Sequence, residues 1–177
     1  MPDPNTQHPT PSTIQLLVLD VDGVLTDGGL YVDDNGKPSK KFNVKDGLGI
    51  KLAQRFGIQV AILTGKTSGV VEHRAKELGI EHVIQGSKNK GADIASLSEK
   101  TGIALGDTAM VGDDLPDLPA FATVGFRVAV GDAVDEVKAA ADFVTVKAGG
   151  RGAVREAVEH LLKAQGKWDE ALAVFQQ

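Results

Sequence analysis

The sequence contains no cysteine in its 177 residues, few aromatic side chains and a deficit of positive charge. Without cysteine the chain has no disulfide, no thiol nucleophile and no cysteine-ligated zinc or iron–sulfur centre. Aromatic residues make up 5% and the net charge is −5, so base-stacking platforms and a basic surface for nucleic acid are both lacking. We therefore expect no nucleic-acid partner and, from the missing thiols, a reducing cytoplasmic location.

Long apolar runs are absent as well. No segment approaches the roughly 20 apolar residues of a membrane span, and residues 1–13 are polar and proline-rich without the apolar core of a secretory signal. We expect a disordered tail there and no membrane association. Hydrophobic residues nevertheless make up 42% of the chain, which is typical of a globular protein, and the length suits one domain.

Short apolar runs alternate with amphipathic segments along residues 14–165. Continuous apolar runs at 14–20 and 58–63 are typical of central parallel strands. The pattern predicts further strands at 82–84, around 110–111, at 126–130 and at 142–146. It predicts helices at 46–55, 67–78, 88–101, 115–121, 132–140 and 152–165, the first of them capped by Asp46. It therefore predicts one α/β domain, a Rossmann-like open parallel sheet with helices on both faces, followed by a C-terminal tail at 166–177.

Residues 28–44 interrupt the alternation and predict a small β-hairpin with its turn at Asn35-Gly36. The apolar positions on its two arms are Leu30, Val32, Phe42 and Val44. An isolated hairpin is marginally stable in water, so this stripe needs a surface to pack on. The stripe could pack on the chain's own domain. We favour the alternative that hairpins of several subunits pack together and close one another's sites.

Acidic residues and glycines follow the predicted strands where they end. The three ends read Asp20-Val21-Asp22-Gly23, Thr64-Gly65 and Gly112-Asp113-Asp114, with Asp117 one turn later. Ligands of open α/β sheets bind at this edge. A single aspartate after a strand is most often a cap or turn former, but capping alone does not account for the whole set. Carboxylates that lie so near one another repel and need a cation between them. Oxygen ligands without histidine or cysteine favour Mg²⁺.

The segments DVDGVLTDG, LTG, a later lysine and VGDDLPD resemble the four motifs of haloacid dehalogenase-type phosphatases, in the same order. The resemblance covers residues 14–165. It implies that Asp20 is the nucleophile that forms an aspartyl-phosphate and that Asp22 is the general acid/base. It also implies that Thr64 binds the phosphoryl oxygens and that Lys90 neutralises phosphate and nucleophile. Lys88 is the alternative, but Lys90 fits the family pattern better.

The same resemblance implies a set of metal ligands. Mg²⁺ would be held by Asp20, Asp113 and the backbone carbonyl of Asp22, while Asp114 and Asp117 would orient these ligands. Because only a hairpin follows the first motif and one helix–strand unit follows the second, no large cap covers the site.

The segments FNVKDGLGI and AGGRGAVREAVEHLLKAQGKWDE resemble one branch of these phosphatases, which acts on 3-deoxy-D-manno-octulosonate 8-phosphate. That branch implies a cytoplasmic, Mg²⁺-dependent homotetramer that releases phosphate from an eight-carbon keto sugar acid in lipopolysaccharide biosynthesis. It also implies Arg74 and Arg151 as substrate-binding residues. The resemblance further implies a C-terminal tail that folds over a neighbour's site, which a flexible Gly149-Gly150 and the tail after Gly166 would permit.

Two alternatives stay open at this point. A phosphatase for a nine-carbon keto sugar acid 9-phosphate, or for another small sugar phosphate, would use the same catalytic residues. Lys66 stands where the branch commonly has arginine; it keeps a charge for the substrate carboxylate but loses the bidentate fork. A non-catalytic binding module on this fold would be expected to lack the nucleophile, and here both Asp20 and Asp22 are present.

Overall fold

The computed structural model describes residues 10–176, so residues 1–9 of the expected disordered tail lie outside the described residues. The last part of the predicted tail, Pro11–Thr13 (η1), forms a single 3-10 turn. The amide of Gln165 donates to the carbonyl oxygens of Pro11 at 3.3 Å and of Ile14 at 2.9 Å. The segment that enters the first strand is therefore tied to the end of the last long helix of the domain.

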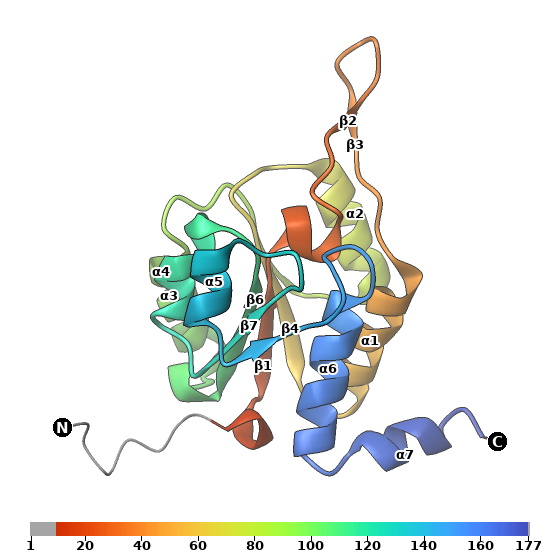
Figure 1. The fold of residues 1–177 in the computed structure, drawn as a ribbon, viewed down its shortest axis with the longest axis vertical. Coiled ribbons are helices and arrows are strands. Elements are labelled where there is room, and N and C mark those ends of the chain that lie inside the picture. Colours follow the sequence, from red (N-terminus) through yellow and green to blue (C-terminus); the bar gives the residue numbers. More distant parts are fainter. Residues whose placement is uncertain (1–9, 177) are drawn as a thin grey trace.

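The centre of the molecule is one sheet of parallel strands, as the sequence predicts (Figure 1). The strands lie in the order β5-β4-β1-β6-β7-β8. Their bounds are β1 (Leu16–Leu19), β4 (Gln59–Leu63), β5 (His82–Ile84), β6 (Thr108–Gly112), β7 (Phe126–Ala129) and β8 (Phe143–Val144). The chain builds outward from β1 through β4 to β5 and then returns to β6 on the other side of β1. The strand order thus reverses next to β1, which is where open α/β sheets bind their ligands.

Helices cover both faces of the sheet, as expected (Figure 1). One face carries α1 (Val44–Arg55), α2 (Gly69–Leu78) and α6 (Ala153–Ala164), and the other carries α3 (Lys90–Thr101), α4 (Leu118–Phe121) and α5 (Asp135–Ala140). Because β1 is enclosed on both sides, all four of its side chains are fully buried. Burial of each such aliphatic side chain contributes about 1.5–3 kcal/mol, so the strand that carries the first motif is held firmly.

The C-terminal segment forms a docked helix, α7 (Trp168–Ala173). Trp168 packs on the hydrophobic core, and the charged ends of Arg155 and Lys163 lie over its ring, 5.7 and 5.4 Å from the ring centre. Figure 1 places α7 at the end of the molecule opposite the hairpin.

Asp46 does not cap the helix that contains it, contrary to the sequence-based expectation. Asn43 is the N-cap of α1 and accepts a hydrogen bond from the backbone N–H of Lys45 at 2.8 Å. Asp46 is buried and accepts backbone N–H groups of Gly152 at 3.3 Å and Arg155 at 2.9 Å. It therefore satisfies the free N–H groups at the start of α6. These partners lie more than 100 residues away in the sequence, where no local pattern reveals them.

Gly149 and Gly150 are not a flexible link, which corrects a second expectation. A Cβ on Gly149 would lie 1.7 Å from the carbonyl oxygen of Gly23, and one on Gly150 would lie 2.3 Å from the backbone nitrogen of Asp27. Gly150 N–H also donates to Val24 O at 2.9 Å. The glycines are required because this loop packs backbone to backbone against the turn that follows β1.

The hairpin consists of β2 (Tyr31–Val32) and β3 (Pro38–Ser39), paired antiparallel, and it projects beyond the body of the molecule (Figure 1). Its loop, residues 33–37, contains Gly36, which has a positive φ of 75°. Leu30 and Val32 are 78% and 60% exposed. Val44, the fourth apolar position of the predicted stripe, is the first residue of α1 and is also exposed, whereas Phe42 packs on the core. Within one chain most of the stripe is therefore uncovered.

Candidate active site

The turn after β1 carries the first motif. Asp20 follows the strand directly, and residues Val21–Leu25 form a tight turn in which Gly23 has a φ of +88°. The hydroxyl of Thr26 accepts the backbone N–H groups of Gly23 at 3.3 Å and Gly28 at 3.2 Å. These bonds fix the turn, so Asp20 stands on a backbone held from both sides.

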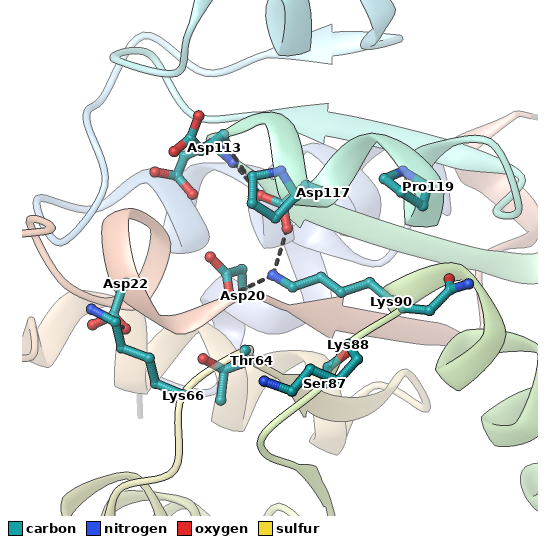
Figure 2. A pocket seen from close by; sticks show the side chains of 14 residues that line it. Asp20, Asp22, Thr64, Lys66, Ser87, Lys88, Lys90, Asp113, Asp117 and Pro119 are labelled. Carbon is teal, nitrogen blue, oxygen red and sulfur yellow. Dashed lines mark hydrogen bonds and ion pairs between the residues drawn. The ribbon is translucent and has the colours of Figure 1, made fainter.

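Lys90, and not Lys88, is the lysine that contacts Asp20 (Figure 2). It is the first residue of α3, and its Nζ lies 2.8 Å from Oδ1 of Asp20 and 2.6 Å from Oδ1 of Asp117. The Lys90 side chain is buried, whereas Lys88 is exposed and lines the same cavity. The structure thus separates the two lysines that the sequence left as alternatives.

The charges of this group shift one another's pKa values. Burial alone would lower the pKa of Lys90, but the carboxylates of Asp20 and Asp117 outweigh it and raise the pKa above its ordinary value. Burial and the charge of Asp117 raise the pKa of Asp20 to about 6, although Lys90 opposes this shift. Lys90 is therefore a permanent cation that favours the ionised form of Asp20 near neutral pH.

Asp117 fixes the backbone of the fourth motif, VGDDLPD. Its Oδ2 accepts the backbone N–H of Asp113 at 2.8 Å and that of Asp114 at 3.3 Å. This approach requires Gly112, where a Cβ would lie 2.7 Å from Asp117. Asp114 is exposed and accepts the N–H of Leu115, so it acts as the cap of the following turn. Asp114 and Asp117 were both expected to orient the metal ligands. Of the two, Asp117 is the one that accepts the backbone N–H of Asp113.

Asp20, Asp113 and Asp117 form a compact cluster, with one carboxylate oxygen from each within 4.8 Å of the others. Lys90 neutralises one of the three charges. Oδ1 of Asp113 is buried and has no hydrogen-bond partner among the described residues. Burial, together with Asp20 and Asp117, raises the pKa of Asp113 to about 8. When all three carboxylates are ionised, two negative charges remain in excess of Lys90. These charges and the unsatisfied oxygen of Asp113 fit a divalent cation, and the all-oxygen donor set fits Mg²⁺.

Gly23 provides the space for Asp113. A Cβ at Gly23 would lie 1.9 Å from Oδ2 of Asp113, and the positive φ there also disfavours any side chain. The first and fourth motifs therefore meet because this one position lacks a side chain.

Asp22 points away from the carboxylate cluster (Figure 2). Its Oδ1 accepts a hydrogen bond from Nζ of Lys40, and its Oδ2 lies 3.9 Å from Nζ of Lys66. Lys40 lies on the hairpin, 18 positions from Asp22 and outside every motif, so no sequence pattern predicts this contact.

These residues share one cavity of about 520 Å³, large enough for a small phosphorylated metabolite. The predicted site residues that line it are Asp20, Asp22, Thr64, Lys66, Lys90, Asp113, Asp114 and Asp117. Thr64 lies buried at the end of β4, and Lys66 is 61% exposed near the rim.

Arg74 and Arg151 do not line this cavity. The guanidinium of Arg74 pairs with Glu77 at 2.8 Å and lies over the ring of Phe42, 5.8 Å from its centre. Arg151 is exposed and lies near Asp27, whose pKa is lowered chiefly by a hydrogen bond from Tyr31 and slightly by Arg151. Neither arginine reaches the site of its own chain.

Residues 80–157 match the sequence model of haloacid dehalogenase-like hydrolases. Over 158 residues the chain is 52% identical to the 3-deoxy-D-manno-octulosonate 8-phosphate phosphatase of Escherichia coli K12, a match that spans 89% of this chain and 84% of that relative. This chain belongs to the 3-deoxy-D-manno-octulosonate 8-phosphate phosphatase family. The member of this family from Haemophilus influenzae is 46% identical over 154 residues, which are 87% of this chain and 86% of the relative.

Solved structures of the phosphatase family share the fold. The Moraxella catarrhalis 3-deoxy-D-manno-octulosonate 8-phosphate phosphatase superposes with a TM-score of 0.91 at 44% identity, covering 93% of this chain and 95% of that one; it holds magnesium, phosphate and the free sugar acid KDO. The cobalt-bound H. influenzae phosphatase gives a TM-score of 0.88 at 42% identity, covering 92% of this chain and 98% of that one. Among the described residues of this family member, no helix combines the length and apolar character needed to cross a membrane.

Proposed function

We propose that this chain is a Mg²⁺-dependent phosphomonoesterase that hydrolyses 3-deoxy-D-manno-octulosonate 8-phosphate to the free sugar acid and phosphate in lipopolysaccharide biosynthesis. The observation that carries the proposal is the convergence of Asp20, Asp22, Lys90 and Asp113 on one cavity. The 52% identity to the E. coli phosphatase supports the choice of substrate.

In the first step, Asp20 attacks phosphorus and the bond from phosphorus to the sugar oxygen breaks. Asp22 gives its proton to the departing alkoxide, which leaves an aspartyl-phosphate on Asp20 and a carboxylate on Asp22. In the second step, Asp22 takes a proton from water as the water oxygen attacks phosphorus, and Asp20 is released. Both steps are in-line phosphoryl transfers in which charge neutralisation and positioning dominate.

Lys90 and Thr64 serve the phosphoryl group. The buried ammonium of Lys90 contacts Asp20 and would compensate negative charge shared by the nucleophile and the phosphate. Thr64, buried at the end of β4, would donate its hydroxyl proton to a phosphoryl oxygen.

Asp20, Asp113 and the backbone carbonyl of Asp22 would hold Mg²⁺. When bound, the ion supplies positive charge that reduces repulsion between the nucleophile and the phosphate. Asp117 keeps Asp113 in place through the backbone N–H of that residue.

The remaining elements concern assembly and substrate selection. Lys66 stands at the cavity rim, where its exposed ammonium is suited to the substrate carboxylate. Exposed Leu30 and Val32 support a homotetramer assembled through the 28–44 hairpin. Arg74 and Arg151 would then act on substrate only across a subunit boundary, as would the C-terminal tail. A charged sugar phosphate as substrate is consistent with a cytoplasmic enzyme.

The test is phosphate release from a panel of substrates with Mg²⁺ or with EDTA: the eight-carbon 8-phosphate, a nine-carbon keto sugar acid 9-phosphate and simple sugar phosphates. We expect the highest kcat/KM for the eight-carbon substrate and no release with EDTA. Asp20→Asn should abolish turnover, whereas the exposed hairpin variant Asp34→Asn, with the same change of charge, should retain it. Equal or reversed preference for the nine-carbon substrate would overturn the substrate assignment, and an active Asp20→Asn would overturn the mechanism.

A further inference from the structure

Lys40 is a largely buried lysine at the base of the exposed hairpin strands. It directly follows β3, where the chain returns from the projecting arm to the body of the molecule. Its side chain is 13% exposed, whereas the neighbouring Lys37 and Lys41 are both exposed. A lysine side chain loses rotamer freedom and hydration on burial, so its position needs a compensating contact.

Asp22 is that contact. The ammonium of Lys40 donates to Oδ1 of Asp22, and the Asp22 side chain is itself 26% exposed. The other cation near Asp22, Lys66, is 3.9 Å from Oδ2 and 61% exposed, so solvent screens that pair. Lys40 is therefore the partner that holds the carboxylate, and it holds only one of the two oxygens.

The Asp22 side chain could point either toward the carboxylate cluster or away from it, and its orientation decides whether it joins that cluster. It follows Asp20 by two residues on a tight turn, yet its side chain is directed away from the cluster of Asp20, Asp113 and Asp117 (Figure 2). In that orientation it lines the cavity without adding a fourth carboxylate to the cluster.

We propose that Lys40 is a positioning residue for Asp22, an inference that rests on the function proposed above. Lys40 anchors Oδ1 and leaves Oδ2 free to carry the proton that passes to the departing alkoxide and is later regained from water. Lys40 acts only through Asp22 and touches neither phosphorus nor the nucleophile. In this way the hairpin contributes a residue to the chemistry of its own chain, apart from any part it plays in assembly.

The prediction depends on the leaving group. A sugar alkoxide needs a proton as it departs, whereas p-nitrophenolate departs readily without one. The value of kcat/KM covers only the steps up to the first irreversible one. It therefore measures how Asp22 acts as an acid when the leaving group departs, and it does not include the later attack of water on the aspartyl-phosphate. We expect Lys40→Met to lower kcat/KM for the sugar acid phosphate about 100-fold and for p-nitrophenyl phosphate less than about threefold.

Variants at neighbouring positions sharpen the test. Lys40→Arg should keep most of the activity, and Lys41→Met, with the same loss of charge one residue away, should behave as the wild type. Asp22→Asn should show the same selectivity for the alkyl substrate, and adding Lys40→Met to it should cost little more, because the two residues act as a unit. Lys40→Gln provides a second neutral variant, and thermal melts of each protein verify folding.

Several outcomes would overturn the proposal. Equal losses on both substrates would make Lys40 a phosphate-binding or purely structural residue, and full additivity with Asp22→Asn would show that the two act separately. Failure of both neutral variants to fold would also assign Lys40 a structural role. If Asp20→Asn remains active, the proposed function itself fails; if Asp20→Asn is inactive while Lys40→Met shows no selectivity, only the assignment of Lys40 fails.

Discussion

Two lysine–aspartate contacts flank the cavity, and they are built in different ways. Lys90 begins α3 on the sheet side, is buried and lies between two carboxylates at 2.8 and 2.6 Å. Lys40 comes from the projecting hairpin and contacts Asp22 alone at the edge of the cavity. The sheet side is fixed by strands, helix starts and glycines with no room for a side chain, whereas the hairpin side depends on one returning arm. We therefore expect the sheet side to control phosphate and metal and the hairpin side to control the leaving group.

Removing the sheet-side cation should have the largest effect. Lys90→Met leaves Asp20 and Asp117 buried without their cation, which costs about 3–5 kcal/mol of folding free energy. It should also lower kcat/KM by roughly 10³-fold for alkyl and aryl phosphates alike, because phosphoryl-group stabilisation does not depend on the leaving group. The measurement is the pair of kcat/KM values, with Lys88→Met as control. A loss confined to the alkyl substrate would erase the contrast between the two lysines.

The contact between the first and fourth motifs can be broken by one methyl group. In Gly23→Ala the new Cβ would lie 1.9 Å from Oδ2 of Asp113, and φ at this position is +88°. We expect Mg²⁺ affinity to fall about 10- to 100-fold, since the ligand is displaced. Calorimetric titration with Mg²⁺ measures this. The control is Gly57→Ala, which has a similar φ of 89° and no atom within 4 Å of the added Cβ; if it weakens Mg²⁺ equally, backbone strain and not contact is the cause.

The carboxylate cluster should make metal-free stability depend on pH. Burial and neighbouring charges raise the pKa of Asp113 to about 8 and that of Asp20 to about 6, against about 3.9 in an unfolded chain. The folded protein then binds more protons than the unfolded one across this window, so its stability falls as pH rises from about 4 to about 8. Thermal melts with EDTA should show this fall, and Mg²⁺ should raise the melting temperature by more at pH 8 than at pH 5.5. An equal effect of Mg²⁺ at both pH values would contradict the cluster as the metal site.

Changes on the hairpin should have the smallest effect on the folded domain. Leu30→Ser with Val32→Ser alters side chains that are 78% and 60% exposed, so the stability of a single chain should change by less than about 0.5 kcal/mol per site. Light scattering should nevertheless show the assembly shift from tetramer to smaller species. A wild-type monomer at micromolar concentration would contradict assembly through the hairpin.

The sheet side was largely predictable from sequence because its residues lie at the ends of strands. Asp20, Thr64 and Asp113 follow continuous apolar runs, and parallel strands bring their ends to one edge. The resemblance of the motifs then implied Lys90, and in the structure the Lys90 ammonium contacts Asp20. The local pattern could not show which of Asp114 and Asp117 orients Asp113, since both precede the same short helix. Only the three-dimensional structure shows that Asp117 accepts the N–H of Asp113.

The hairpin side and the helix starts were less predictable, because their partners are distant in sequence. Asp46 looks like the cap of its own helix, yet it accepts N–H groups from the start of α6. Gly149 looks like a hinge, yet it packs on the carbonyl of Gly23. Lys40 lies in no motif at all. In each case a polar or small residue serves a contact that periodicity does not encode.

The most direct test of the account is to trap phosphate on Asp20. The wild type is mixed with Mg²⁺ and radiolabelled sugar acid phosphate, quenched in acid within milliseconds and digested, and the labelled peptide is sequenced. With the label on the phosphoryl group, we expect a transient, acid-stable label on the peptide that contains Asp20 and no label in Asp20→Asn. Rapid turnover by an Asp20→Asn protein, or a label on a peptide without Asp20, would contradict it.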